Sequence, residues 1–233
     1  MMEKERIKDF LLDVFFPKFC FGCQKEGEYL CEDCRETLEI FKNHLPFSSP
    51  YLSDLYFPLE YKNPLLKKLI VSFKYSPFVK ELAKDLSFLI VQHFLLLEKI
   101  PDFSDFYLLP IPLTKRRMRW RGFNQAEEIA KELAKFLKIP LIREGLLRTR
   151  DNLPQVELGE RERRENIKGV FQVKEKEAIF GKKILLVDDI YTTGATMEEA
   201  ARVLREAGAK KIVGLCLAKA SPGEDKISGG GGI

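Results

Sequence analysis

The sequence has few of the residues that most often act as general bases. Its 233 residues include only two histidines, His44 and His93. His44 stands beside a linker that contains proline and serine, where we expect a solvated side chain, with a further metal ligand as the alternative. His93 falls in a helical pattern, where we expect it to pack. No other residue stands out as a general base, so the sequence does not support a mechanism built on one.

Long apolar runs are also missing. None reaches the roughly 20 residues that a transmembrane helix requires. The first residues, Met1–Arg6, are polar and do not form a signal peptide. We therefore expect a cytoplasmic protein with no stable membrane insertion. The formal charge of +4, from 39 basic and 35 acidic residues, is modest. The length suits one α/β core with a small appendage.

Four of the five cysteines lie close together in two C-x-x-C pairs with seven residues between them. The candidate metal ligands are Cys20, Cys23, Cys31 and Cys34. Four thiolates form a closed tetrahedral site, typical of structural zinc. An iron–sulfur site is the alternative, and two disulfides are disfavoured in a reducing cytosol. An amphipathic helix is expected over residues 3–16, before this zinc finger. Cys216 lies in an apolar strand and is expected to be an inert buried thiol.

One stretch combines a buried strand, two acids and a small polar loop. The apolar residues Ile184–Val187 predict a strand, Asp188 and Asp189 follow it, and Met197–Ala207 has helical periodicity. The loop between them contains Thr192, Thr193, Gly194, Ala195 and Thr196. Hydroxyls and free N–H groups at a helix N-terminus favour a phosphate. The aspartates would then serve sugar hydroxyls or a divalent cation. The alternative is an ordinary strand–helix turn with capping threonines.

A second stretch, residues 107–125, predicts a strand, a basic loop and a helix. Five of the seven residues from Lys115 to Arg121 are basic. Ligands bind at the carboxyl ends of parallel strands, so this loop could hold pyrophosphate. It could equally hold nucleic acid, for which Trp120, Phe123 and Tyr75 offer stacking surfaces, or be a solvated charge run. The candidate binding residues are Lys115, Arg116, Arg119 and Arg121.

Residues 143–166 contain six arginines and a break near Asp151–Pro154. They predict either a mobile flap over a site or a surface hairpin followed by an exposed helix over 159–166. Further strands are expected at Leu55–Tyr61, Lys168–Val173 and Ile212–Lys219. The whole pattern predicts an α/β fold with a central parallel sheet of about five strands flanked by helices.

The run Lys183–Thr196 resembles the binding motif of type I phosphoribosyltransferases, with its four hydrophobic residues, two acids and Thr-Thr-Gly-x-Thr loop. A wider set of motifs resembles the ComF competence family, within it the members built on a phosphoribosyltransferase-like domain. These motifs cover nearly the whole chain: the four cysteines, Lys74–Tyr75, the Pro-x-Pro-Leu strand end with its basic loop, Arg121–Gln125, Arg148, Gln155, Arg161 and Asn166–Gly169. We therefore expect an N-terminal helix and four-cysteine zinc finger over residues 1–45 and a phosphoribosyltransferase-like domain over 51–220. The low-complexity end predicts a flexible tail over 221–233.

This resemblance also implies ligands and partners. Phosphoribosyl pyrophosphate would place its 5′-phosphate on Thr192–Thr196 and its ribose hydroxyls at Asp188 and Asp189, with Mg²⁺ near its pyrophosphate. The implied role is in DNA uptake during natural transformation, with single-stranded DNA as a partner and an uptake helicase as another. The alternatives are a non-enzymatic single-stranded DNA-binding protein and a nucleobase phosphoribosyltransferase of salvage metabolism.

Overall fold

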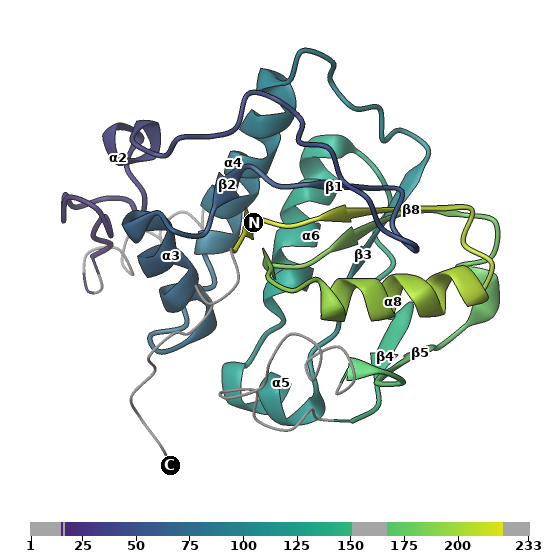
Figure 1. Ribbon diagram of the computed structural model, residues 1–233. Coiled ribbons are helices and arrows are strands. Elements are labelled where there is room, and N and C mark those ends of the chain that lie inside the picture. Colours follow the sequence, from purple (N-terminus) through teal and green to yellow (C-terminus); the bar gives the residue numbers. More distant parts are fainter. Residues whose placement is uncertain (1–14, 16, 151–166, 221–233) are drawn as a thin grey trace, which may run out of the picture.

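The computed structural model describes residues 15, 17–150 and 167–220 of the chain (Figure 1). Three sequence expectations fall almost wholly outside these ranges. They are the amphipathic helix over 3–16, the 151–166 part of the arginine-rich segment and the tail over 221–233. Within the described ranges, no helix is both long and apolar enough to cross a membrane.

A four-stranded parallel sheet forms the centre of the molecule, in the order β1-β8-β6-β3. Its strands are β1 (Asp54–Tyr56), β8 (Lys211–Leu215), β6 (Lys183–Val187) and β3 (Phe106–Pro110). Leu141 adds a single parallel bridge to Leu108 at the outer edge of β3. Three short strands continue this sheet at its carboxyl end, in the order β2-β9-β7. They are β2 (Leu59–Glu60), β9 (Ala218–Lys219) and β7 (Ile190–Tyr191).

The expected parallel α/β fold is confirmed, with differences in the strands. The central sheet has four strands where about five were expected, and the expected strands Leu55–Tyr61 and Ile212–Lys219 each divide into two. The segment Lys168–Val173 does not join the central sheet. Its last residues form β5 (Phe171–Val173), which pairs antiparallel with β4 (Leu146–Arg148). The partners of this hairpin lie far apart in the sequence, so periodicity alone could not reveal the pairing.

Helices cover both faces of the sheet (Figure 1). One face carries α3 (Pro64–Lys74), α4 (Leu82–Leu96) and α6 (Gln125–Leu137), and the other carries α8 (Ala195–Glu206) with the β4–β5 hairpin. Side chains of β6 alternate between the two cores, because successive residues of a strand point to opposite faces. Leu185 and Val187 pack in the α3–α4–α6 core, whereas Ile184 and Leu186 pack in the α8 core.

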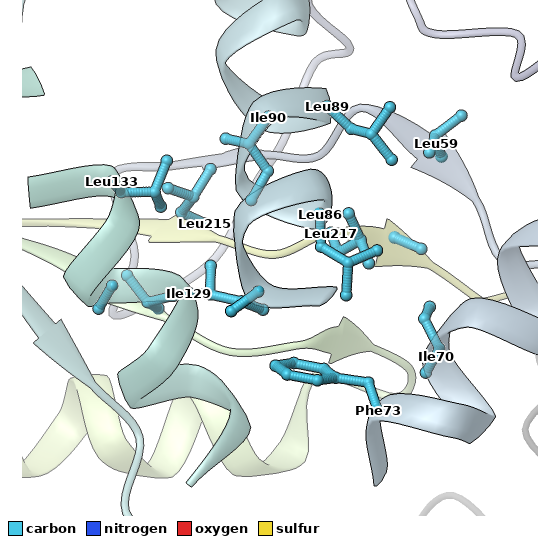
Figure 2. Packing of buried hydrophobic residues seen from close by; sticks show 14 of the residues in the cluster. Leu59, Ile70, Phe73, Leu86, Leu89, Ile90, Ile129, Leu133, Leu215 and Leu217 are labelled. Atoms are coloured by element: carbon cyan, nitrogen blue, oxygen red, sulfur yellow. The ribbon is translucent and has the colours of Figure 1, made fainter. Parts of the chain in front are cut away.

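The larger core is built from leucine, isoleucine and phenylalanine side chains of the three helices (Figure 2). Phe73 and Ile70 of α3, Leu86 and Ile90 of α4, and Leu133 of α6 are fully buried there. Fully burying a side chain of this size contributes about 1.5–3 kcal/mol to the free energy of folding. This packing fixes the end of α3, at Lys74, relative to the sheet.

The cysteine-containing segment lies against α3 and α4. Its short helix α2 (Glu32–Glu36) follows Cys31, and Leu30 and Leu38 join the same core as the helices. The Arg35 guanidinium lies over the Phe88 ring, 4.9 Å from its centroid. The remaining elements are α5 (Lys115–Arg121) and the 3₁₀ turn η1 (Lys176–Ala178).

Candidate functional site

The strand ends of the central sheet open into a cavity of about 270 Å³. Pro110 of β3 pairs with Val187 of β6, and the Ile111 N–H donates to the Val187 carbonyl at 2.9 Å. The loop after β3 therefore lies beside Asp188 and Asp189, which follow β6. The volume is close to the lower end of the range for small-molecule pockets, about 300–1,000 Å³. The residues lining this cavity come from the end of α3, the loop after β3, α5, the start of α6, β4 and the segment from β6 to the first turn of α8, together with Tyr61 after β2.

The two aspartates form one wall of the cavity. The Asp189 carboxylate lies 2.8 Å from the Lys74 ammonium, and the Asp189 N–H donates to Asp188 Oδ1 at 2.8 Å. Burial of its carboxyl, together with the neighbouring Asp189 charge, raises the pKa of Asp188 to about 7, while Lys74 opposes the shift. The two adjacent carboxylates suit a ligand that brings hydroxyls, or a cation that prefers oxygen ligands.

The loop before α8 provides N–H groups at the helix N-terminus. Gly194 caps the helix with a φ of 76°, in the left-handed region. A Cβ there would lie 2.1 Å from the Tyr191 hydroxyl, so the position requires glycine. Thr192 and Thr196 line the cavity. The Thr193 hydroxyl instead accepts from the Ala195 N–H at 3.4 Å, inside the loop. The first turn of α8 therefore faces an anion-binding position beside the acids.

Helix α5 brings two arginines to the opposite side of the cavity. Its N-cap Thr114 accepts from the Arg117 N–H at 3.2 Å, and it ends at Gly122 with a φ of 77°. Arg117 and Arg121, one turn apart, line the cavity. Burial lowers the pKa of Arg121, and the Asp189 charge opposes that shift. The guanidinium stays charged, because the usual pKa of arginine is too high for deprotonation in a folded protein.

Gln125 fixes the direction of Arg121. The buried Gln125 accepts from Arg121 Nη1 at 2.9 Å and donates to the Phe73 carbonyl at 3.1 Å. It thereby ties α5 to the end of α3. Arg121 Nε has no hydrogen-bond partner among the described residues. A buried donor in that state favours an incoming acceptor such as a phosphate oxygen.

The structure separates the predicted basic residues into two groups. Arg121 lines the cavity, whereas Lys115, Arg116 and Arg119 are exposed and do not line it. Phe123 is also not a stacking surface, since it is 7% exposed and packs against Phe73. That expectation was wrong because Phe123 joins the core between α5 and α6, where its ring packs with the buried side chains of the helices.

Reasoning from chemistry alone missed several side chains of the cavity. Arg117 and Arg148 were counted in basic segments but not selected, Tyr75 was offered only as a stacking surface, and Lys74 entered only through a family resemblance. Tyr61 carried no signal at all. The structure places all five at the cavity. They come from four separate segments, and only the fold brings them together.

The four predicted metal ligands lie together. The Sγ atoms of Cys20, Cys23, Cys31 and Cys34 are all within 4.8 Å of one another. A single ion with bonds of about 2.3 Å places its four sulfurs about 3.8 Å apart, so the cluster could hold one metal ion such as zinc. Cysteines that ligate different irons of a cluster would lie further apart.

The local backbone supports this use of the thiolates. Burial opposes ionisation of Cys20, yet N–H groups of Cys31, Cys23 and Gly22 lower the pKa of its thiol to about 6. The Gly22 N–H lies 3.4 Å and the Cys31 N–H 3.5 Å from Cys20 Sγ. A Cβ on Gly22 would lie 2.5 Å from Cys34 Sγ, so glycine is needed for the sulfurs to converge.

The two histidines and the fifth cysteine lie outside the cavity. His93 is buried and its Nδ1 lies 2.7 Å from the Phe41 carbonyl, whereas His44 Nε2 lies 2.8 Å from Asp54 Oδ1. Cys216 is buried, and that burial raises the pKa of its thiol. Within the described residues, the cavity therefore contains carboxylates, cations and hydroxyls but no imidazole or thiol.

Comparison with known proteins gives one consistent family. The phosphoribosyl transferase domain matches residues 121–229. Competence protein F of Haemophilus influenzae is 29% identical over 214 residues, or 86% of this chain and 90% of that protein. DNA utilization protein YhgH of Escherichia coli K12 is 30% identical over 210 residues, or 86% and 88%. Competence protein ComFC of Bacillus subtilis is 40% identical over 110 residues, or 46% and 41%.

Among solved structures, the glutamine phosphoribosylpyrophosphate amidotransferase from B. subtilis, complexed with ADP and GMP, is similar to 58% of this chain and 25% of that one. Its sequence identity is 20% and its TM-score 0.34, too low to bear on function. Competence protein F and YhgH, in contrast, align along about nine-tenths of their lengths, with 90% and 88% covered. Together with the matching domain and the parallel α/β fold, they establish that this chain belongs to the ComF family of phosphoribosyltransferase-like proteins.

Proposed function

We propose that the cavity binds phosphoribosyl pyrophosphate and that the protein uses this site in handling single-stranded DNA during DNA uptake. The observation that carries the proposal is the adjacent pair Asp188 and Asp189, of which Asp189 forms an ion pair with Lys74. The pair shares the cavity with a helix N-terminus and with two arginines of α5. A phosphate site alone gives no reason to keep two carboxylates beside it. A ribose between two phosphate groups does, because its hydroxyls donate to carboxylates.

The phosphate of the ribose 5′ end fits the loop before α8. The N–H groups after Gly194 and the hydroxyls of Thr192 and Thr196 supply donors, and the helix dipole favours the negative charge. Thr193 and Ala195 hold the loop's shape, through the hydrogen bond between them. Asp188 and Asp189 then face the ribose 2′- and 3′-hydroxyls.

The pyrophosphate end fits the opposite wall. Arg117, Arg121 and Arg148 supply fork-shaped donors for phosphate oxygens, and Lys74, which pairs with Asp189, adds a further cation. Mg²⁺, the expected companion of pyrophosphate, would neutralise its charge and add oxygen coordination beside the acid pair. The adjacent carboxylates of Asp188 and Asp189 would offer oxygen ligands to such a cation.

The chain's own contribution to a transfer at ribose C1 would be positioning and electrostatics. The acids hold the ribose, and the arginines stabilise negative charge on the departing pyrophosphate. We assign both acids to the ribose hydroxyls and give no described residue of the cavity the role of general base. The incoming nucleophile must then supply most of the driving force, which leaves the acceptor to be identified by experiment.

The nucleic-acid part of the proposal has separate support. The relatives are named as competence and DNA utilization proteins, and α5 presents exposed basic residues beside the cavity. Such residues bind phosphates along a nucleic-acid backbone. We extend the proposal to a cytoplasmic location with zinc in the four-cysteine site, where it stabilises the finger, and to an uptake helicase as a partner.

Calorimetric titration of phosphoribosyl pyrophosphate with Mg²⁺ tests the cavity. We expect saturable, Mg²⁺-dependent binding that weakens by about 100-fold or more in the Asp188→Asn/Asp189→Asn variant, since each hydrogen bond to a charged group contributes about 1.5–3 kcal/mol. The matched control is Asp102→Asn/Asp105→Asn. It removes two carboxylates that precede β3, at the amino ends of the strands and away from the cavity at their carboxyl ends. It should bind normally.

Two outcomes would overturn parts of the proposal. Equal affinity in the wild type and the Asp188→Asn/Asp189→Asn variant would mean that the acids do not face the ligand. Absence of binding in the wild type, alongside salt-sensitive DNA binding, would leave a non-enzymatic DNA-binding protein. Pyrophosphate release in the presence of a free nucleobase, but not of DNA, would favour salvage metabolism.

A further inference from the structure

Helix α5 has two chemically different faces. Residues four apart lie on the same side of a helix, because one turn contains 3.6 residues. Arg117 and Arg121 form the pair that lines the cavity. The other two pairs are Lys115 with Arg119 and Arg116 with Trp120, and all four of these residues are exposed. We call Lys115, Arg116, Arg119 and Trp120 the outer face of α5.

The outer face does not belong to the cavity. None of its four residues lines the cavity, although the helix itself forms part of the wall. Three cations within five residues make it strongly positive, and the helix ends at Gly122, close to the cavity mouth. The ligand for this face must therefore be negatively charged, and it must be reachable from solvent.

Trp120 is an exposed aromatic side chain held in place by its neighbours. Its ring is 56% exposed, yet its centroid lies 5.7 Å from that of Tyr75 and 5.4 Å from that of Phe78, both edge-on. The Arg121 guanidinium lies 5.8 Å from the same ring. Tyr75 lines the cavity, so Trp120 lies at its mouth. With 56% of its surface exposed, the Trp120 side chain is accessible to a ligand that stacks on it.

We propose that the outer face of α5 binds single-stranded nucleic acid, with the backbone on Lys115, Arg116 and Arg119 and one unpaired base stacked on Trp120. This inference rests on the proposed function and assigns its nucleic-acid partner to a surface. The cations alone would suit any polyanion. The exposed ring selects a strand with free base faces, because the bases of a duplex are already stacked on one another. A base on Trp120 lies beside the cavity, so the two ligands meet at its mouth.

The chain offers a direct optical test, since Trp120 is its one tryptophan. All indole fluorescence therefore comes from the outer face. Adding a poly-dT strand of about 20 nucleotides should quench this fluorescence in parallel with binding, measured separately by anisotropy of a dye on the DNA. If the anisotropy shows saturated DNA binding while the tryptophan emission stays unchanged, the proposal that a base stacks on Trp120 is overturned.

A charge-removal variant tests the backbone contacts. We expect Lys115→Gln/Arg116→Gln/Arg119→Gln to bind the same strand about 100-fold more weakly at 0.1 M salt. Three lost phosphate contacts should also reduce the slope of log affinity against log salt by about 2, at about 0.7 per contact for a single strand. The control is Lys176→Gln/Lys210→Gln/Lys211→Gln, which removes the same charge from exposed lysines on η1 and at the start of β8. It should behave as wild type.

Removing the ring should act differently from removing charge. Trp120→Ala should weaken binding by about tenfold or more without changing the salt slope, and Trp120→Phe should restore most of the loss. Phosphoribosyl pyrophosphate binding should be unchanged in the outer-face charge variant. Circular dichroism and zinc content check that each variant is folded.

The outcomes separate the two proposals. A wild-type protein that binds no single-stranded DNA would remove the DNA part of the proposed function. A wild type that binds DNA, with an equally strong outer-face charge variant, would overturn only the assignment to α5. Equal binding of duplex DNA or polyglutamate, with no effect of Trp120→Ala, would show that this surface recognises charge alone and would overturn the choice of partner.

Discussion

The acid pair allows a prediction about stability that needs no ligand. Asp188→Asn removes a carboxyl whose pKa is raised in the folded protein from the usual 3.8 to about 7 by burial and by the Asp189 charge. In the unfolded chain this carboxyl ionises near its usual pKa. The folded state therefore binds more protons than the unfolded state between these values, and the wild type loses stability as the pH rises through them.

The size of the effect follows from the two pKa values. The difference between 3.8 and about 7, at about 1.4 kcal/mol per pH unit, corresponds to about 4 kcal/mol. Asp188 lies on a cavity wall that solvent can reach, so we expect about half of this, about 2 kcal/mol. Asparagine keeps the acceptor for the Asp189 N–H and does not ionise. Asp188→Asn should therefore be more stable than the wild type at pH 8.5, and its advantage should shrink toward pH 5.

Urea denaturation in Mg²⁺-free buffer from pH 5 to 8.5 measures this difference. The control is Asp102→Asn, because a hydrogen bond from the Ser104 N–H lowers the pKa of Asp102, which stays ionised throughout this range. Its stability difference from the wild type should not vary with pH. The reasoning would be refuted if the Asp188→Asn variant unfolds more easily than the wild type at pH 8.5. It would also be refuted if the difference in the free energy of unfolding is the same at every pH. The protein would then tolerate an ionised Asp188 at no cost in stability, and the argument that this carboxylate faces a ligand would weaken.

Two further predictions concern backbone positions and the metal. Gly194→Ala should lower the free energy of unfolding by about 1–2 kcal/mol, because alanine disfavours the left-handed φ of 76°. It should also abolish phosphoribosyl pyrophosphate binding in calorimetry, since the new Cβ displaces Tyr191; normal affinity would place the phosphate elsewhere. Cys34→Ser should lower zinc content from one ion per chain, measured by mass spectrometry, and lower the melting temperature, whereas the matched Cys216→Ser should retain its zinc. Equal zinc in both would exclude the four-cysteine site.

Local sequence was sufficient for the parts of the site that lie within one strand–loop–helix unit. The apolar run before Asp188, the small loop and the periodic helix are consecutive, so their chemistry can be read without knowing the fold. The paired cysteines were visible for the same reason. The parallel sheet followed from alternating strands and helices, and the family match confirms that fold class.

The rest of the site depends on contacts between distant segments. Lys74 and Asp189 are 115 positions apart, and only the packing of α3 brings them to 2.8 Å. The basic run of α5 divides into an inward and an outward set because the helix is oriented by Thr114 and Gln125, which no periodicity in seven residues can specify. Arg148 reaches the cavity from a hairpin whose second strand begins at Phe171. Tertiary packing decides such placements.

The position of the four-cysteine segment on α3 and α4 has a practical consequence for dissecting this protein. Leu30 and Leu38 fill part of the same core as Leu66 and Leu69 of α3, and Gly22 lies close to Leu65. Cutting the chain at the linker would uncover apolar side chains that water never meets in the intact protein. Any loss of DNA binding in such a fragment would then reflect aggregation as readily as a missing contact. Point substitutions of exposed residues in the four-cysteine segment are the better way to find which partners this segment contacts.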